Sequence, residues 1–198
     1  MSLKLNSNSL TVASSGGGSG VSTSDVTTLI KNNTPWQFIA KLTANASTEL
    51  EYTSLTTDFQ TFRIMYDDLT FNQNTHVHMQ LYLDGTLVTS NYHTAGRASL
   101  GSSNSMTSNN NNYWEITDIY ESGYGDRHFM GHTDFGCNNT SSPKHMLSDT
   151  TSSQSNQPSV YRFGGYMSTG STSLITGFKL ICVSGNFVKG SIKIYGMN

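Results

Sequence analysis

Charged side chains are scarce in this chain of 198 residues. Lysine, arginine, aspartate and glutamate together make up 12% of it, whereas ordinary globular domains contain about 25%. The 11 basic residues are scattered singly, and the formal net charge at pH 7 is −2. Because nucleic-acid binding needs a basic surface that neutralises phosphates, the sequence predicts no nucleic-acid partner.

Long hydrophobic runs are absent and cysteines are few. No apolar stretch approaches the roughly 20 residues that a membrane-spanning helix needs, so we expect no membrane partner. The first residues carry no charged segment followed by an apolar one, which predicts no secretory signal. Cys137 and Cys182 are too few for a disulfide scaffold, and we expect synthesis in a reducing cytoplasm. Cys182 lies in an apolar run and is predicted to be a buried thiol.

Aromatic and small polar residues are abundant instead. Hydrophobic residues reach only 35%, but aromatic residues reach 11%, which is more than disordered chains usually contain. Asn, Ser, Thr and Gly take the place of the missing charged and apolar residues. A surface of hydroxyl and amide groups suits a solvated β-structure, and the length predicts one main domain with its own core.

The first 35 residues differ in composition from the remainder and predict an appendage for anchoring or oligomerisation. Residues 14–20 have the composition of a linker. Ser22 and Asp25 form a capping box, which predicts a short helix over residues 23–31 that ends before Pro35. So short a helix is marginal alone in water, and its apolar stripe needs its own domain or copies of the chain as a partner. The predicted oligomerisation residues are Val26, Leu29 and Ile30.

From Trp36 onward, apolar and polar residues alternate with a period of two, which predicts β-strands. The clearest strand spans residues 75–83 and is followed by Asp84-Gly85, a tight hairpin turn. The residues of this strand that we expect to face inward are Val77, Met79, Leu81 and Leu83. Those that we expect to face outward are His76, His78, Gln80 and Tyr82.

Two long polar stretches interrupt this pattern. We expect loops over residues 96–112 and 138–158, and a last pair of strands joined at residues 184–186. About eight to ten strands with long loops are typical of a β-sandwich or jelly roll. The predicted fold class is therefore all-β, an antiparallel jelly-roll-like sandwich over residues 36–198 preceded by the arm and helix of residues 1–35. Trp36 and Trp114 are expected in its core.

Four segments of the predicted sandwich carry a family resemblance. The first contains WQFIA and TANAS within residues 36–52, and the second contains FQTFRIMY, MQLYLDG and NYH within residues 59–93. The third is ITGFKL at residues 175–180, and the fourth is SGNFVKGSIKIYG at residues 184–196. The last and most specific segment resembles the closing hairpin of jelly-roll domains in fibre, tail and head-decoration proteins of aquatic bacteriophages. In such a hairpin Gly190 would relax the returning strand, and Tyr195-Gly196 would end it at the sheet edge. The resemblance implies a jelly roll, a homotrimer and a place in the virion, and it carries over no catalytic residues.

His76 and His78 are the residues that best suit a metal ion. Residues i and i+2 share one face of a strand, so both imidazoles could reach one ion. The third-ligand candidates are Asp126, His128, His132 and Asp134. Because His-x-His spacing also occurs by chance on polar strand faces, a solvent-exposed or intersubunit histidine pair is the preferred interpretation. We predict no metal and no other cofactor.

Motifs for an enzyme are few. The neighbouring carboxylates that a glycoside hydrolase could use are Glu49 with Glu51, Asp67 with Asp68, and Glu115 with Asp118. The sequence contains no Gly-x-Ser-x-Gly elbow, no phosphate-binding glycine loop and no Cys-x-x-Cys motif. The prediction is a non-enzymatic protein, and a small metal-dependent or glycosidic enzyme is the last alternative.

Aromatic residues near the amide-rich loops suggest a second function. Sugar rings pack on aromatic faces and bond to nearby Asn and Asp, so the alternative is a glycan-binding module or receptor-binding tip. The candidate glycan-binding residues are Tyr92, Tyr113, Tyr120 and Tyr124. Core and subunit-interface positions are also rich in aromatic residues, which is the competing interpretation.

The first prediction for function follows from the resemblance. It is a non-enzymatic virion subunit of a bacteriophage, in a fibre, in the tail or on the capsid, made in the host cytoplasm. It would assemble as a homo-oligomer, expected to be a trimer, and would contact other virion proteins through residues 1–20. A contribution to host attachment through a surface glycan is compatible with this role.

Overall fold

The computed structural model describes residues 2–6, 9–13, 35–100, 103–119, 128–138, 142–154, 157–168 and 172–198. The chain divides into two compact units, Met1–Gln37 and Phe38–Asn198. Every regular element within the described ranges is a β-strand. No helix in these ranges is long and apolar enough to cross a membrane.

The first unit contains an antiparallel hairpin of β1 (Ser2–Asn6) and β2 (Ser9–Ala13). Its register sets Leu3 opposite Val12 and Leu5 opposite Leu10. The described part of the predicted arm is therefore a pair of strands. The helix predicted over residues 23–31, with Val26, Leu29 and Ile30, lies outside the described residues.

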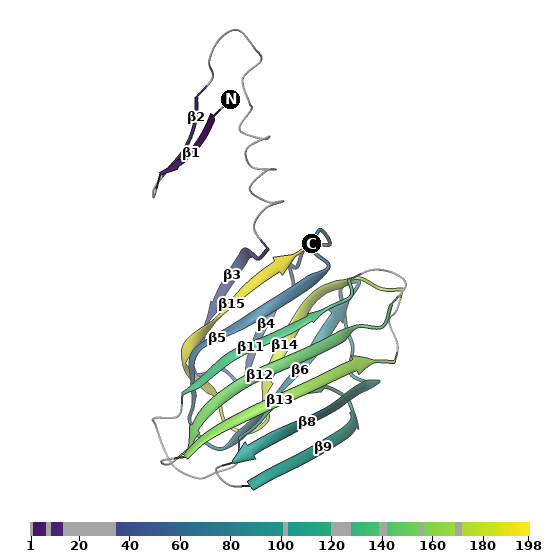
Figure 1. The fold of residues 1–198 in the computed structure, drawn as a ribbon. Helices are drawn as coiled ribbons and strands as arrows, with labels where there is room; N and C mark the ends of the chain where they lie inside the picture. Colours follow the sequence, from purple (N-terminus) through teal and green to yellow (C-terminus); the bar gives the residue numbers. More distant parts are fainter. Residues whose placement is uncertain are drawn as a thin grey trace. The chain divides into compact units, whose positions relative to one another are not determined.

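The second unit is a sandwich of two antiparallel sheets, and Figure 1 shows the smaller sheet behind the larger one. The larger sheet consists of β3 (Gln37–Thr43), β5 (Thr61–Phe71), β8 (Tyr92–Leu100), β9 (Ser103–Asn111), β11 (Phe129–Gly136), β12 (His145–Gln154), β13 (Gln157–Met167) and β15 (Phe187–Met197). Its strand order is β3-β15-β5-β11-β12-β13-β8-β9.

The smaller sheet consists of β4 (Glu49–Tyr52), β6 (Thr75–Leu83), β7 (Thr86–Leu87), β10 (Trp114–Ile119) and β14 (Ile175–Cys182). Its order is β10-β6-β14-β4, and β7 pairs with β6 through a tight turn. Asp84 and Gly85 form this turn with φ angles of 48° and 81°, so the hairpin turn predicted from Asp-Gly is confirmed.

The core lies between the two sheets. In β6 the residues predicted to face inward, including Val77 and Met79, are buried, which confirms the inward half of the assignment. A row of rings fills the centre of the sandwich, where Phe62 stacks on Phe135 and Phe135 meets Phe178 edge-on. Burial of this apolar surface is the main force that holds the sheets together. Cys182 is buried as predicted, and burial raises the pKa of its thiol.

The two tryptophans differ in burial. Trp114 is fully buried, as predicted. Trp36, also expected in the core, is only half-buried and precedes β3. In β3 itself Phe38 is exposed, whereas Ile39 packs against the core. Apolar character at the start of this strand was therefore a poor guide to which residues become buried.

Both long polar stretches predicted as loops contain β-hairpins, so that prediction was wrong. β8 pairs with β9, and β12 pairs with β13, and the two hairpins extend the larger sheet. The positions of β12 that point into the sandwich include Ser148 and Thr150, both fully buried. The Thr133 hydroxyl donates a hydrogen bond to the Ser148 hydroxyl at 3.0 Å. An inner face built from hydroxyls has no hydrophobic period, which is why the sequence pattern missed it.

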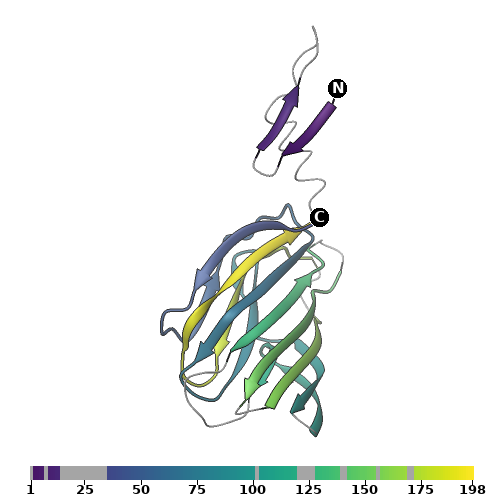
Figure 2. The ribbon, with the colours of Figure 1, turned by 60° about the vertical axis from the view of Figure 1, so that its left-hand side comes forward.

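The last two strands do not form a hairpin, which corrects a second expectation. Residues 184–186 carry the chain from β14 in the smaller sheet to β15 in the larger sheet. Figure 2 shows the yellow strand β15 between the blue strands β3 and β5, so Tyr195 and Gly196 lie inside the sheet and not at its edge. Gly190 has a φ of 90° at a register shift between β15 and β5, where the backbone is irregular as predicted.

Candidate functional site

Strands β6 and β10 bring two histidines and a glutamate together on the face of the smaller sheet that points away from the core. The antiparallel register sets Glu115 opposite His78, with a register shift between Glu115 and Thr117. His76 and His78 alternate with the core residue Val77, so both lie on the outer face of β6. We call His76, His78 and Glu115 the histidine–glutamate cluster.

The cluster is compact. The Nδ1 atom of His76 lies 3.5 Å from the Oε1 atom of Glu115. One potential ligand atom from each of the three side chains lies within 4.8 Å of the other two. The ring of Tyr113 stacks on the ring of His78, with 3.4 Å between centroids and 10° between planes. The stacked tyrosine holds the orientation of one imidazole and shields it from solvent.

Burial sets the electrostatics of the cluster. His78 is only 9% exposed and Glu115 only 6%, although both lie on an outer face. The interpretation as a solvent-exposed histidine pair is therefore wrong for His78. Burial lowers the pKa of His78 to about 4, and it outweighs the opposite effect of Glu115. The His78 imidazole is consequently neutral near pH 7.

The turn before β10 provides this cover. Tyr113 and Asn112 lie between β9 and β10, and the side-chain amide of Gln80 donates a hydrogen bond to the Asn112 carbonyl at 3.0 Å. Gln80 is 8% exposed, so this outward position of β6 is also covered. The segment that ends at Tyr113 therefore converts part of an outer sheet face into a second, polar interior.

The segment predicted to supply a third metal ligand lies in a different place. Its described part belongs to or directly precedes β11 of the larger sheet. His128 pairs with Asp68, and Asp134 accepts two hydrogen bonds of 2.6 Å from the Arg63 guanidinium. Asp126 lies outside the described residues. Among the described residues, His128, His132 and Asp134 do not join His76.

Sequence reasoning missed Glu115 as a companion of the histidines. It was considered only with its sequence neighbour Asp118, as a candidate carboxylate pair. The 36 residues between His78 and Glu115 include the β8–β9 hairpin, and only the pairing of β10 with β6 brings the two residues together. The local signal that could have found it is a glutamate in the strand that follows a long hairpin, which is too general to be useful.

The other carboxylate neighbours are compensated by cations. Glu49 and Glu51 lie 3.0 Å and 3.9 Å from the Nζ atom of Lys179. Asp67 accepts a hydrogen bond of 2.7 Å from Lys193, which holds the pKa of Asp67 below its usual range. A catalytic carboxylate pair needs one pKa raised by burial or by the charge of its partner, and a lysine between or beside the carboxylates works against that effect.

Tyr92, a predicted glycan-binding residue, is a core residue instead. It has no exposed surface. Its hydroxyl donates a hydrogen bond to the Val88 carbonyl at 2.9 Å and accepts one from the Leu81 amide at 2.8 Å. The hydroxyl thus satisfies backbone groups inside the sandwich, and the ring is not available to a sugar.

The other predicted tyrosines divide into one that is described and two that are not. Tyr113 is half-buried, and one face of its ring is occupied by His78. Tyr120 and Tyr124 lie outside the described residues.

A second aromatic surface, at a tyrosine outside the four glycan-binding candidates, lies on the larger sheet. Tyr166 of β13 lies opposite His145 of β12 and His93 of β8 in the strand register. The rings of His93 and Tyr166 stack with 4.5 Å between centroids and 7° between planes. Tyr166 is 44% exposed. A pocket of about 360 Å³ adjoins the stack and is lined by His93, Thr94, Ala95, His145, Gly164, Gly165 and Tyr166.

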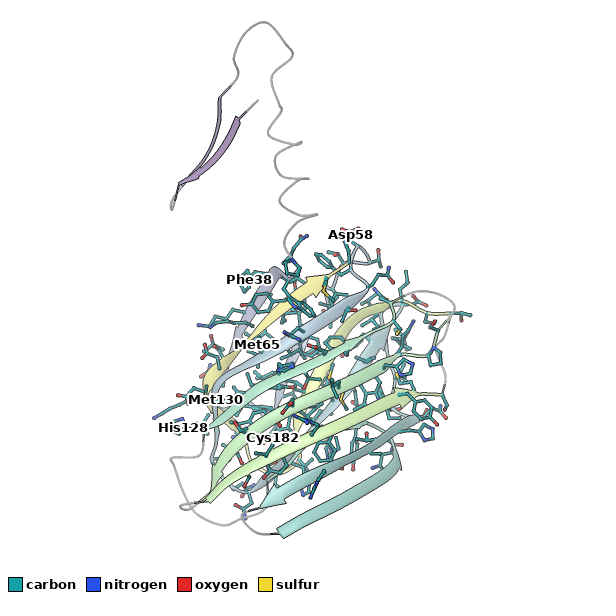
Figure 3. The ribbon with its side chains drawn as sticks, in the orientation of Figure 1. Phe38, Asp58, Met65, His128, Met130 and Cys182 are labelled. Atoms are coloured by element: carbon teal, nitrogen blue, oxygen red, sulfur yellow. The ribbon has the colours of Figure 1, made fainter. Side chains whose placement is uncertain are left out.

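The remainder of the outer face of the larger sheet mixes ion pairs with exposed apolar residues. Arg162 donates hydrogen bonds of 3.1 Å and 2.6 Å to Asp149 on the neighbouring strand. Met65 and Met130, labelled in Figure 3, are 37% and 50% exposed on β5 and β11. The face is therefore neither uniformly charged nor uniformly apolar.

Scans against protein-family models, curated proteins and solved structures found no match to this chain.

Proposed function

We propose that this protein is a non-enzymatic structural subunit of a bacteriophage virion, in a fibre, in the tail or on the capsid. It would assemble as a homo-oligomer, a trimer as the resemblance implies, and contact other virion proteins through residues 1–20. The observation that carries the proposal is the separate N-terminal unit with its hairpin of β1 and β2. An isolated two-stranded hairpin is at best marginally stable in water, so a partner is expected to complete it.

We further propose that the sandwich is a jelly roll, as the resemblance implies. Eight of its strands alternate between the sheets in a regular way, with β3-β15-β5-β11 in one and β4-β14-β6-β10 in the other. Each of these quartets combines strands from the beginning and the end of the domain, which is typical of two interlocked Greek keys. The hairpins β8–β9 and β12–β13 are then additions to the larger sheet.

The oligomeric state of the full chain tests this proposal. Mass photometry or light scattering should give a particle near three times the chain mass of 21.6 kDa. Removal of residues 1–13 should leave the sandwich folded, because it is a separate unit, but should weaken assembly or incorporation into particles. A monodisperse monomer whose behaviour is unchanged by the truncation would contradict the proposal.

A second function, glycan binding, has its own support in the pocket beside Tyr166. The ring of Tyr166 is accessible, and stacking on His93 holds its orientation. Small residues lie beside this ring in the lining of the pocket. A methyl group built at Gly164 would find its nearest neighbour, the Met146 carbonyl, only at 4.0 Å, so this side of the strand is open. A flat exposed ring beside a hollow with polar imidazoles suits a sugar ring, which presents both C–H and O–H groups.

Replacement of Tyr166 tests the glycan proposal. On a glycan array displaying host-surface sugars, the wild-type protein should bind at least one class, and Tyr166→Ala should lose that signal. Val160→Ala is the matched control, because Val160 is 43% exposed on the same strand and should leave binding intact. No signal from the multivalent wild-type protein, or equal signals from both variants, would remove this function.

A further inference from the structure

We propose that His76, His78 and Glu115 form a binding site for a divalent first-row transition-metal ion, with Zn²⁺ as the first probe. The site is independent of the virion role and of the pocket beside Tyr166. It joins two strands of the smaller sheet, β6 and the edge strand β10.

The distances in the cluster are close to those of a metal site. In a tetrahedral zinc site with bonds of about 2.0–2.2 Å, the ligand atoms lie about 3.3 Å from one another. His76 Nδ1 and Glu115 Oε1 are already 3.5 Å apart. All three ligand atoms fall within 4.8 Å, so small rotations of side chains close the remaining gap without movement of the strands.

The ligands are held by rigid elements. All three residues belong to paired strands, and sites on strands are better defined than sites on loops. The stacked ring of Tyr113 restricts the rotation of His78. The side chain of His76 is 30% exposed, whereas that of Glu115 is 7% exposed. An ion would therefore enter on the side of His76.

The donor set favours transition metals over the hard cations. Two imidazole nitrogens and one carboxylate oxygen match sites that hold zinc with three protein ligands and leave a fourth position for water or another group. Mg²⁺ and Ca²⁺ prefer sites built only from oxygen atoms. A bound cation would also place positive charge beside the carboxylate of Glu115, which is 6% exposed.

Direct titration of the full chain, purified without a histidine tag and stripped with chelator, tests the site. Isothermal titration should give one Zn²⁺ per chain, and Mg²⁺ or Ca²⁺ should give no heat of specific binding. Because the ion binds only the folded site and joins β10 to β6, a concentration about a hundredfold above Kd should raise Tm by about 5–10 °C.

Two variants and two matched controls assign the ligands. Glu115→Gln and His76→Asn should each weaken Zn²⁺ binding by at least about 100-fold, since loss of a ligand costs more than the 10–100-fold loss typical of residues behind the ligands. Glu51→Gln makes the same chemical change on β4, at the opposite edge of the smaller sheet, and His132→Asn removes a histidine of the larger sheet. Both controls should bind like the wild type.

The outcome can overturn the proposal in three ways. These are the absence of stoichiometric Zn²⁺ binding by the wild type at micromolar concentration, full affinity in Glu115→Gln and His76→Asn, and an equal loss of affinity in the two controls. Circular dichroism distinguishes loss of the site from loss of the fold. Histidine-ring NMR signals provide a second readout, because Zn²⁺ should shift those of His76 and His78 and leave those of His93 and His145 unchanged.

Discussion

Two histidine–tyrosine stacks occupy the outer faces of the two sheets, and they differ in almost everything except their geometry. His78 and Tyr113 lie 10° from parallel, and His93 and Tyr166 lie 7° from parallel. The first histidine is buried, with a carboxylate and a second imidazole beside it. The second stack is exposed through its tyrosine and adjoins a pocket with glycine and alanine in its lining.

The comparison shows that the residues around a histidine–tyrosine stack, and not the stack itself, determine which kind of ligand it can bind. Beside Glu115 and a second imidazole, with ligand atoms within 4.8 Å of one another, an imidazole becomes a candidate metal ligand. Beside small residues on an open sheet, the same kind of pair becomes a flat surface for a ligand ring. Sequence patterns alone would not separate the two, since each pair joins residues from different strands.

One side chain connects the two stacks. Trp114 follows Tyr113 in the chain and precedes Glu115 of the histidine–glutamate cluster. Its Nε1 atom donates a hydrogen bond of 3.2 Å to the backbone carbonyl of Tyr166. Trp114 is fully buried, so it packs between the sheets and links the outer site of the smaller sheet to that of the larger one.

The largest expected effect is therefore that of Trp114→Ala. Loss of a fully buried tryptophan should lower the free energy of unfolding by about 3–5 kcal/mol, and it should disturb both stacks together. Urea denaturation followed by fluorescence or circular dichroism measures the change. Val183→Ala is the control, because Val183 is 50% exposed and should change stability little. A loss below about 1 kcal/mol for Trp114→Ala would mean that the two faces are not connected through this ring.

A pH titration of stability sharpens the difference between the stacks. In the folded, metal-free protein the pKa of His78 is about 4, against an ordinary value of 6.5. Between these two pH values His78 is protonated in the unfolded chain but neutral in the folded protein. The free energy of unfolding therefore decreases as pH falls from 6.5 towards 4. At about 1.4 kcal/mol per pKa unit, the loss due to this group is about 3 kcal/mol.

Urea denaturation in the presence of a chelator, repeated at several pH values, checks this prediction. His78→Asn should flatten the dependence in this pH range, whereas Val183→Ala, at an exposed position, should leave it in place. A wild-type profile that is flat between pH 4 and 6.5, or a slope that His78→Asn retains, would contradict the expected burial of His78.

Two adjacent glycines of β13 give the smallest and most local test. A methyl group at Gly165 would lie 2.7 Å from Cδ1 of Trp114, whereas one at Gly164 would point into open space. Gly165→Ala should therefore lower the free energy of unfolding by about 1–3 kcal/mol through overpacking. Gly164→Ala should change it by less than about 0.5 kcal/mol while filling part of the pocket beside Tyr166. Equal effects in urea denaturation would mean that β13 does not present its two faces as described.

Much of the fold follows from local pattern. Alternation in β6 predicted which residues enter the core, Asp84-Gly85 predicted the turn, and the apolar run around Cys182 predicted a buried thiol. These features depend on backbone geometry and on side chains that are neighbours in the chain. The polar hairpins escaped prediction, because buried hydroxyls such as those of Ser148 and Thr150 leave no apolar period to detect.

The sequence by itself determined that the domain is built from strands and which face of β6 meets the core, because a period of two is a local property. Only the tertiary structure decided that β15 inserts between β3 and β5, that Glu115 reaches His78, and that the ring of Tyr92 lies inside. The physical reason is that strand partners and covering segments come from distant parts of the chain. Whether a polar side chain ends exposed, buried or beside a possible ligand depends on those partners.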